Sequence, residues 1–132
     1  MRKVILRWKI PSLRGAKELS KFLEVAERVE VLGHLAVSSE GVTQLVEIKM
    51  REGHSVDEIS NFDSFEVLEQ HEEDSDGVLV SLLCTHPLAV SAIEMSNIHV
   101  QPPYGIDAER GMELRLSGRS KSIRRFLALL KM

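Results

Sequence analysis

The chain lacks the features that would place it outside the cytoplasm. It has 132 residues and a single cysteine, Cys84, which excludes a disulfide within the chain and favours a reducing, intracellular location. No apolar run is long enough to cross a bilayer. The N-terminus, MRKVILRWKIPS, alternates charged with apolar residues and has no continuous apolar stretch of the signal-peptide type. We therefore expect a cytoplasmic protein that does not contact a membrane.

An excess of positive charge is also lacking. The chain carries 17 Lys and Arg residues against 20 Asp and Glu residues, with a net charge of −3 and a pI of about 6.0. Neutralising phosphates requires clustered Lys and Arg, so nucleic-acid binding by this chain alone is not expected. The basic residues gather near the N-terminus and in the last helix, and the acidic residues gather in the middle. A solvated surface explains this segregation, and the alternative is that it orients a partner.

Catalytic motifs are missing as well. The sequence contains no P-loop, no Rossmann glycine pattern and no Ser/His/Asp nucleophile motif. An acylphosphatase would need an arginine in a glycine-rich first loop and an asparagine on the following hairpin. Arg14 lies in the first loop, but residues 29–50 contain no asparagine. We therefore expect a protein that is not an enzyme and that carries no cofactor.

What the sequence does contain is a hydrophobic pattern that occurs twice. In the first half, alternating apolar and charged residues predict a strand over 3–10. Apolar residues spaced by three and four positions predict a helix over 13–26. Two alternating runs, 29–37 and 42–50, are joined by a short turn and predict a β-hairpin.

The first half closes with a second helix and a fourth strand. Ser55-Val56-Asp57-Glu58 has the form of a capping box, in which a serine hydroxyl accepts from a backbone N–H and the glutamate reaches back. It predicts a short helix. A strand then begins at Phe65 and fades into the acidic residues 70–75. We expect the boundary between the halves near Asp76.

The second half restarts the pattern at Gly77. A continuous apolar run predicts a central strand that is covered on both faces. The remaining predicted elements are a helix that starts at Thr85-His86-Pro87, a strand at Ile98 and Val100, a break at Gln101–Gly105, a strand over Met112–Leu116, and a helix capped by Ser120. The chain ends where a last strand is due.

This order predicts an α+β fold made of tandem ferredoxin-like (ACT-like) βαββαβ units with antiparallel sheets. The first unit covers residues 1–76. The second covers 77–132, lacks its last strand, and packs against the first as one regulatory domain. An unpaired edge would result, so either another molecule covers it or the natural protein continues beyond Met132.

The second half also follows an order of segments typical of one family. The segments are Leu79 to His86-Pro87-Leu88, Ala89–Ala92, Ile98 through Gln101-Pro102-Pro103, Gly111–Leu114, Leu116–Arg119 and Ile123–Leu127. They resemble the N-terminal domain of archaeal helix-turn-helix regulators similar to the bacterio-opsin activator. The first half fits this resemblance through its basic opening strand, its amphipathic helix and its hairpin strand at 42–47. The resemblance implies a regulatory input module that precedes a C-terminal DNA-binding domain, which this chain does not contain.

Two positions are candidates for ligand chemistry. Arg14 could hold a carboxylate in the first strand–helix loop, where Gly15 allows close backbone approach; a plain helix-starting turn is the alternative. Cys84 and His86 lie at a strand-to-helix junction, where a thiolate near a helix N-terminus could sense oxidants or bind metal. The alternative is a small buried Cys beside a His in the capping turn, because one Cys and one His do not complete a zinc shell.

No metal site is expected from the other potential ligands. The remaining histidines, His34, His54, His71 and His99, show no helical pairing and no adjacent cysteine. The acidic stretch at 72–76 lacks the ligand spacing and the central glycine of a calcium loop.

These observations lead to two functional hypotheses. The first is a non-enzymatic sensory or dimerisation domain of an archaeal transcriptional regulator, which couples a small molecule or a partner to an attached DNA-binding domain. It is expected to form a homodimer. The alternative is a free-standing ACT-like homodimer that binds an amino acid. The regulator hypothesis predicts that the gene continues past Met132 into two helices joined by a short turn.

Overall fold

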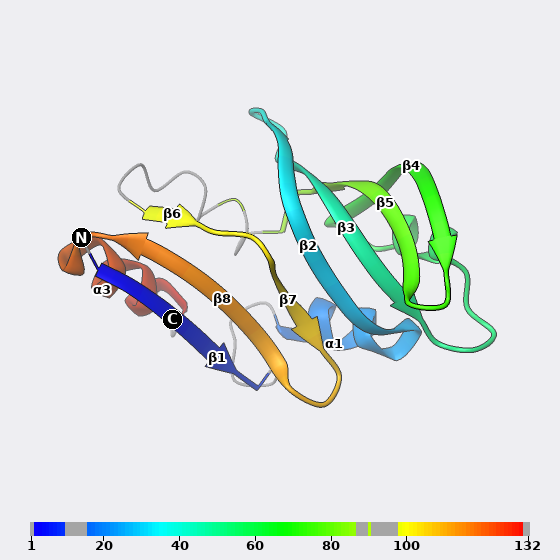
Figure 1. Ribbon diagram of the computed structural model, residues 1–132, viewed down its shortest axis with the longest axis horizontal. Helices are drawn as coiled ribbons and strands as arrows, with labels where there is room; N and C mark the ends of the chain where they lie inside the picture. Colours follow the sequence, from blue (N-terminus) through cyan, green and yellow to red (C-terminus); the bar gives the residue numbers. More distant parts are fainter. Residues whose placement is uncertain (1, 10–15, 87–89, 91–97, 131–132) are drawn as a thin grey trace.

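The computed structural model is an α+β fold built on one eight-stranded antiparallel sheet (Figure 1). It describes residues 2–9, 16–86, 90 and 98–130. The elements are β1 (Arg2–Trp8), α1 (Ala16–Val25), β2 (Ala26–Val37), β3 (Val42–Met50), η2 (Val56–Asn61), β4 (Phe65–Asp74), β5 (Gly77–Cys84), β6 (Ile98–Val100), β7 (Tyr104–Asp107), β8 (Gly111–Gly118) and α3 (Ser120–Leu130). The predicted fold class and the antiparallel sheet are confirmed at this level.

The sheet has the strand order β1-β8-β7-β2-β3-β5-β4, and β6 pairs separately with β8. Every strand pair is antiparallel. The predicted pair of separate sheets is not what the structure contains, because β7 pairs with β2 and joins all the strands into one sheet. Asp76 lies in the tight turn of the β4–β5 hairpin, where Asp74 pairs with Gly77. A turn within one sheet does not test where one unit ends and the next begins, so the boundary near Asp76 stays a prediction.

Each half of the chain contributes one strand to the other half's side of the sheet. β1 pairs with β8, from Arg2 opposite Gly118 to Trp8 opposite Met112. β5, from the second half, lies between β3 and β4 of the first half. Sequence periodicity assigns residues to a strand face but not to a pairing partner, so this exchange could not be predicted from the alternation alone.

Local chemistry explains the elements that the sequence predicted well. The β2–β3 hairpin closes through paired backbone hydrogen bonds between Ser38 and Gly41. The capping box is also present: the Ser55 hydroxyl accepts from Asp57 N–H, and the Glu58 carboxylate accepts from Ser55 N–H at 3.1 Å. The helix that it opens is a 3-10 helix. The predicted α3 is confirmed and begins at Ser120 itself.

Two strands differ from the prediction. β4 runs as a strand to Asp74, although residues 70–75 look like an acidic loop, because β5 supplies backbone partners along this edge as far as the pair Asp74–Gly77, with two register shifts on the way. β7 begins at Tyr104, inside the segment predicted as a break. The prolines lie just before β7, so its backbone is free to pair with β2 and β8.

Two helix predictions have different outcomes. α1 ends at Val25, and Ala26 begins β2 rather than ending the helix. Residues 13–15 lie outside the described part, as does most of the helix predicted after Thr85; within it, Val90 is helical and its N–H donates to the His86 carbonyl. No helix in the described ranges is long and apolar enough to cross a membrane.

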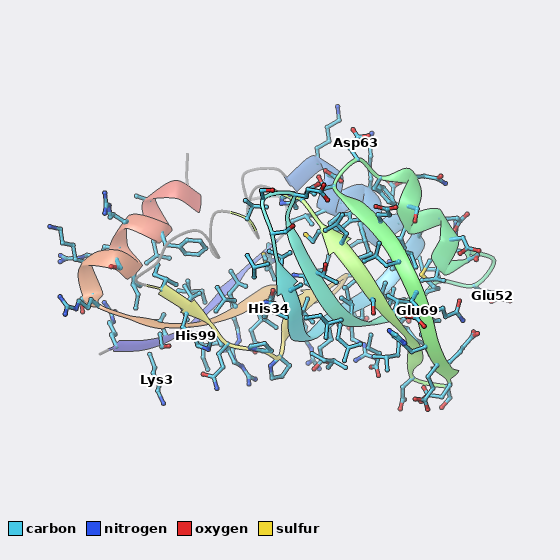
Figure 2. The ribbon with its side chains drawn as sticks, turned by 90° about the horizontal axis from the view of Figure 1, so that it is seen from above. Lys3, His34, Glu52, Asp63, Glu69 and His99 are labelled. Atoms are coloured by element: carbon cyan, nitrogen blue, oxygen red, sulfur yellow. The ribbon has the colours of Figure 1, made fainter. Side chains whose placement is uncertain are left out.

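The helices cover one face of the sheet, and the opposite face is open (Figure 2). A larger hydrophobic cluster joins α1 and η2 to β2, β3, β5 and β7, with Phe22 and Ile59 almost fully buried. A smaller cluster joins Phe126 of α3 to β6 and β8. Lys3 extends from the open face in Figure 2, where Ile5 is 54% exposed.

The sheet consists of two groups of strands, one of β1, β6, β7 and β8 and the other of β2, β3, β4 and β5. The pairing of β7 with β2 links the two groups. It spans four residue pairs, from Arg28 opposite Asp107 to Val31 opposite Tyr104. Gly105 makes this approach possible, because a Cβ at that position would collide with the Val29 carbonyl oxygen and lie 3.0 Å from Glu30 Cα. Tyr104 and Met112 pack against both clusters.

Replacing Gly105 should therefore weaken the link. We expect Gly105→Ala to lower the free energy of unfolding by about 1–3 kcal/mol, because backbone atoms must move to admit the methyl group. Gly33→Ala is the matched control, since a Cβ there meets nothing within 4 Å. Urea unfolding followed by circular dichroism measures both, and equal stability of the two variants would contradict the role of Gly105.

Candidate functional site

The candidate site is a cavity between the two hydrophobic clusters, on the helix-covered face of the sheet. Its volume is about 90 Å³. The residues that line it come from both groups of strands and from α1: Leu19, Phe22, Val29, Val31, Gln44, Phe65, Leu82, Cys84, His86, Val100, Tyr104, Gly105, Ile106, Met112 and Leu114. Its lining is almost entirely apolar, with a few polar groups, which is the usual composition of a small-molecule site.

A hydrogen-bonded chain of three side chains reaches the cavity from β2, β3 and β7. Gln44 Nε2 donates to the Tyr104 hydroxyl at 2.9 Å, and the same hydroxyl lies 2.7 Å from His34 Nε2. Gln44 is only 4% exposed. The β3 alternation explains this burial, because Val42, Gln44 and Val46 point to the same, covered face.

The charge states in this chain follow from burial. Burial lowers the pKa of His34, and the nearby His99 lowers it further, so the imidazole is neutral at neutral pH. Burial raises the pKa of Tyr104, and the hydrogen bond from Gln44 opposes this only in part. A neutral imidazole can accept the Tyr104 proton while the hydroxyl oxygen accepts from Gln44. The site therefore presents hydrogen-bonding groups without a net charge.

Two predicted site residues, Cys84 and His86, do line the cavity. Cys84 is 3% exposed and His86 4% exposed. The His86 ring stacks on Phe65 with 6.2 Å between ring centroids. Burial raises the pKa of the Cys84 thiol to about 11, which a hydrogen bond with the His86 backbone opposes only in part. The protonated thiol lacks the nucleophilic thiolate that redox sensing needs.

Arg14 and Gly15, the other predicted ligand site, lie outside the described residues, so that prediction stays untested. A neighbouring contact does hold α1 beside the cavity. The Glu18 carboxylate accepts hydrogen bonds from Ser64 N–H at 2.9 Å and from the Ser64 hydroxyl at 2.8 Å. The Ser64 carbonyl in turn accepts from Thr85 N–H. These bonds connect α1 to the end of β5 on the cavity side.

Most of the described histidines interact with side chains of other types. His54 pairs with Glu58, and His71 lies 2.6 Å from the Ser81 hydroxyl. His34 and His99 are close enough to interact electrostatically, which the sequence spacing did not indicate (Figure 2). Within the described ranges, no three His, Cys, Asp or Glu side chains are placed to hold a metal ion.

Sequence reasoning missed Gln44 and Tyr104 as site residues. The signal for Gln44 was present, because it is a polar residue on the apolar phase of a strand whose other inward positions are valine and isoleucine. Tyr104 carried no such signal, since it stands in a segment that the prolines mark as a break.

Comparisons with protein-family models, with curated proteins and with solved structures find no match for this chain.

The environment of Cys84 predicts low reactivity. Because its pKa rises by about two units, from 9.0 to about 11, the thiolate fraction at neutral pH should fall about a hundredfold. We expect a thiol reagent to label native protein at least that much more slowly than protein in denaturant. Peroxide should affect the wild-type chain and Cys84→Ser alike. Rapid labelling of the native thiol would restore the redox hypothesis.

Proposed function

We propose that this chain is a non-enzymatic sensory and dimerisation domain of a transcriptional regulator, and that the cavity binds its small-molecule effector. The observation that carries the proposal is the position of the cavity. Its lining includes Val31 and Leu82 on one side and Val100 and Leu114 on the other, so it draws on both hydrophobic clusters. A molecule bound there would contact both groups of strands at once.

This position provides a mechanism for coupling. The two groups of strands are linked by the four residue pairs between β2 and β7, so their relative arrangement depends on what fills the space beside this link. An effector that fits one arrangement better would increase its population. An attached DNA-binding domain would then be repositioned by a shift in population, as in other allosteric proteins.

The strand order supports the idea that the two groups of strands are two ferredoxin-like units. A βαββαβ unit places its first strand between its third and fourth strands. The segment β4-β5-β3-β2 has this order with β5 as the first strand, and β1-β8-β7 has it with β1 as the first strand. We infer two ferredoxin-like units that have exchanged their first strands.

The resemblance to archaeal regulators of the bacterio-opsin-activator type supports the same function, and the coding sequence tests it directly. The proposal predicts that the gene continues beyond residue 132 into two helices joined by a short turn. A stop codon directly after Met132 would refute the attached DNA-binding domain. The free-standing ACT-like homodimer would then be the better hypothesis.

Filling the cavity tests whether it is the effector site. Val31 and Val46 are cross-strand partners on the covered face, but only Val31 lines the cavity. We expect Val31→Phe to be tolerated because the ring can enter the cavity, whereas Val46→Phe should cost about 1–3 kcal/mol by overpacking. Val31→Phe should also abolish any ligand-induced rise in melting temperature. Equal destabilisation by both changes would argue against an accessible cavity.

The edge charges bear on the proposed homodimer. β1 carries Arg2, Lys3 and Arg7, and β4 carries five acidic residues, namely Glu66, Glu69, Glu72, Glu73 and Asp74. Pairing like edges of two copies would bring like charges together, which is unfavourable.

If the homodimer forms through like edges, salt should strengthen it by screening this repulsion. Sedimentation velocity at low and high ionic strength measures the effect. Dimers that dissociate as salt increases would instead indicate contacts between opposite charges.

A further inference from the structure

The size of the cavity limits the ligand. At about 90 Å³, it is smaller than the engineered cavity of about 150 Å³ that admits benzene in another protein. Without rearrangement of the lining, it admits a molecule of about four to six non-hydrogen atoms. Nucleotides, sugars and long acyl chains are too large to be enclosed in it.

The charge of the lining limits the ligand further. The described residues that line the cavity include no Asp, Glu, Lys or Arg. The nearby Glu18 carboxylate is already engaged by Ser64. Transferring an ionised carboxylate or ammonium group into such surroundings is strongly unfavourable without an opposite charge. An amino-acid zwitterion would bring two such groups, so the cavity is a poor site for the ligand of an ACT-type module.

The polar groups define the remaining requirement. The bond from Gln44 to Tyr104 uses one N–H of the amide. A primary amide has two N–H donors and a carbonyl acceptor, so Gln44 can also donate to, or accept from, a bound molecule. The Tyr104 hydroxyl beside it is already bonded to Gln44 and His34. Apart from Tyr104, Cys84 and His86, the described lining is apolar, as at Val31 and Leu82. Complementary chemistry is therefore an apolar body with one neutral hydrogen-bonding group.

We propose that the cavity selects small uncharged molecules with an apolar body and one hydroxyl or amide group, and that Gln44 recognises that group. Short branched alcohols and small primary amides belong to this class. This inference rests on the proposed function, because it describes the ligand of the same cavity. It also goes beyond it, because a sensory domain could equally bind a charged metabolite.

Matched pairs of probes test the ligand class on the chain as it stands. Isobutanol and isobutyramide should raise the melting temperature in proportion to the logarithm of their concentration, whereas isobutyrate and valine should not. Isobutanol should bind more tightly than isopentane, the hydrocarbon of the same size and branching. Nuclear magnetic resonance shifts should appear at Val31, Leu82 and Leu114, which line the cavity from three different strands.

Variants then assign the recognition to Gln44. Gln44→Leu should weaken isobutanol binding about 3- to 10-fold, which is the effect of losing one neutral hydrogen bond, and should leave isopentane binding unchanged. Thr43→Val is the matched control, because Thr43 is on the opposite face of the same strand and does not line the cavity. Val31→Phe should abolish binding of every probe.

The outcomes that contradict this inference differ from those that contradict the proposed function. If valine or isobutyrate binds in the cavity, the uncharged class is wrong and the sensory proposal survives. If isopentane binds as tightly as isobutanol and Gln44→Leu has no effect, recognition by Gln44 is wrong. If no probe changes the melting temperature or the spectra, and Val31→Phe destabilises the fold like Val46→Phe, the cavity holds no ligand and both proposals fail.

Discussion

The close approach of β7 to β2 is the constraint on which the rest of the structure depends. Only a residue without a side chain fits where Gly105 lies against the Val29 carbonyl. This short pairing joins strands that would otherwise form two smaller sheets, and it leaves a space between two hydrophobic clusters. Tyr104, the neighbour of Gly105, is held at that space by its hydrogen bonds to Gln44 and His34. The link and the cavity are thus products of the same few residues.

The chemistry of the cavity separates the functional hypotheses more sharply than the fold does. A sheet with helices on one face serves many functions, so the fold alone cannot choose among them. The neutral lining, the buried Gln44 and the protonated Cys84 favour binding of an uncharged molecule over thiol chemistry or amino-acid recognition. The cavity lies beside the β2–β7 link, and its lining comes from both groups of strands.

Local signals in the sequence predicted much of the secondary structure and part of the site. The hairpin at β2 and β3, the capping box at Ser55 and the helix after Arg119 all depend on residues close together in the chain. Cys84 and His86 were recognised because they flank a strand end. β4 was predicted too short, because its acidic residues look like a loop until β5 provides hydrogen-bonding partners. The cavity escaped prediction because its walls come from eight separate parts of the chain.

The sequence by itself determined which residues face the core, since alternation and helical spacing depend only on neighbours along the chain. It also determined that a single cysteine leaves no disulfide within the chain and that the net charge is slightly negative. Only the tertiary structure decided that β1 pairs with β8, that β5 lies between β3 and β4, and that Gln44, Tyr104 and His34 meet. Strand partners are chosen by competition among all available edges, and a period of two residues is the same for every one of them.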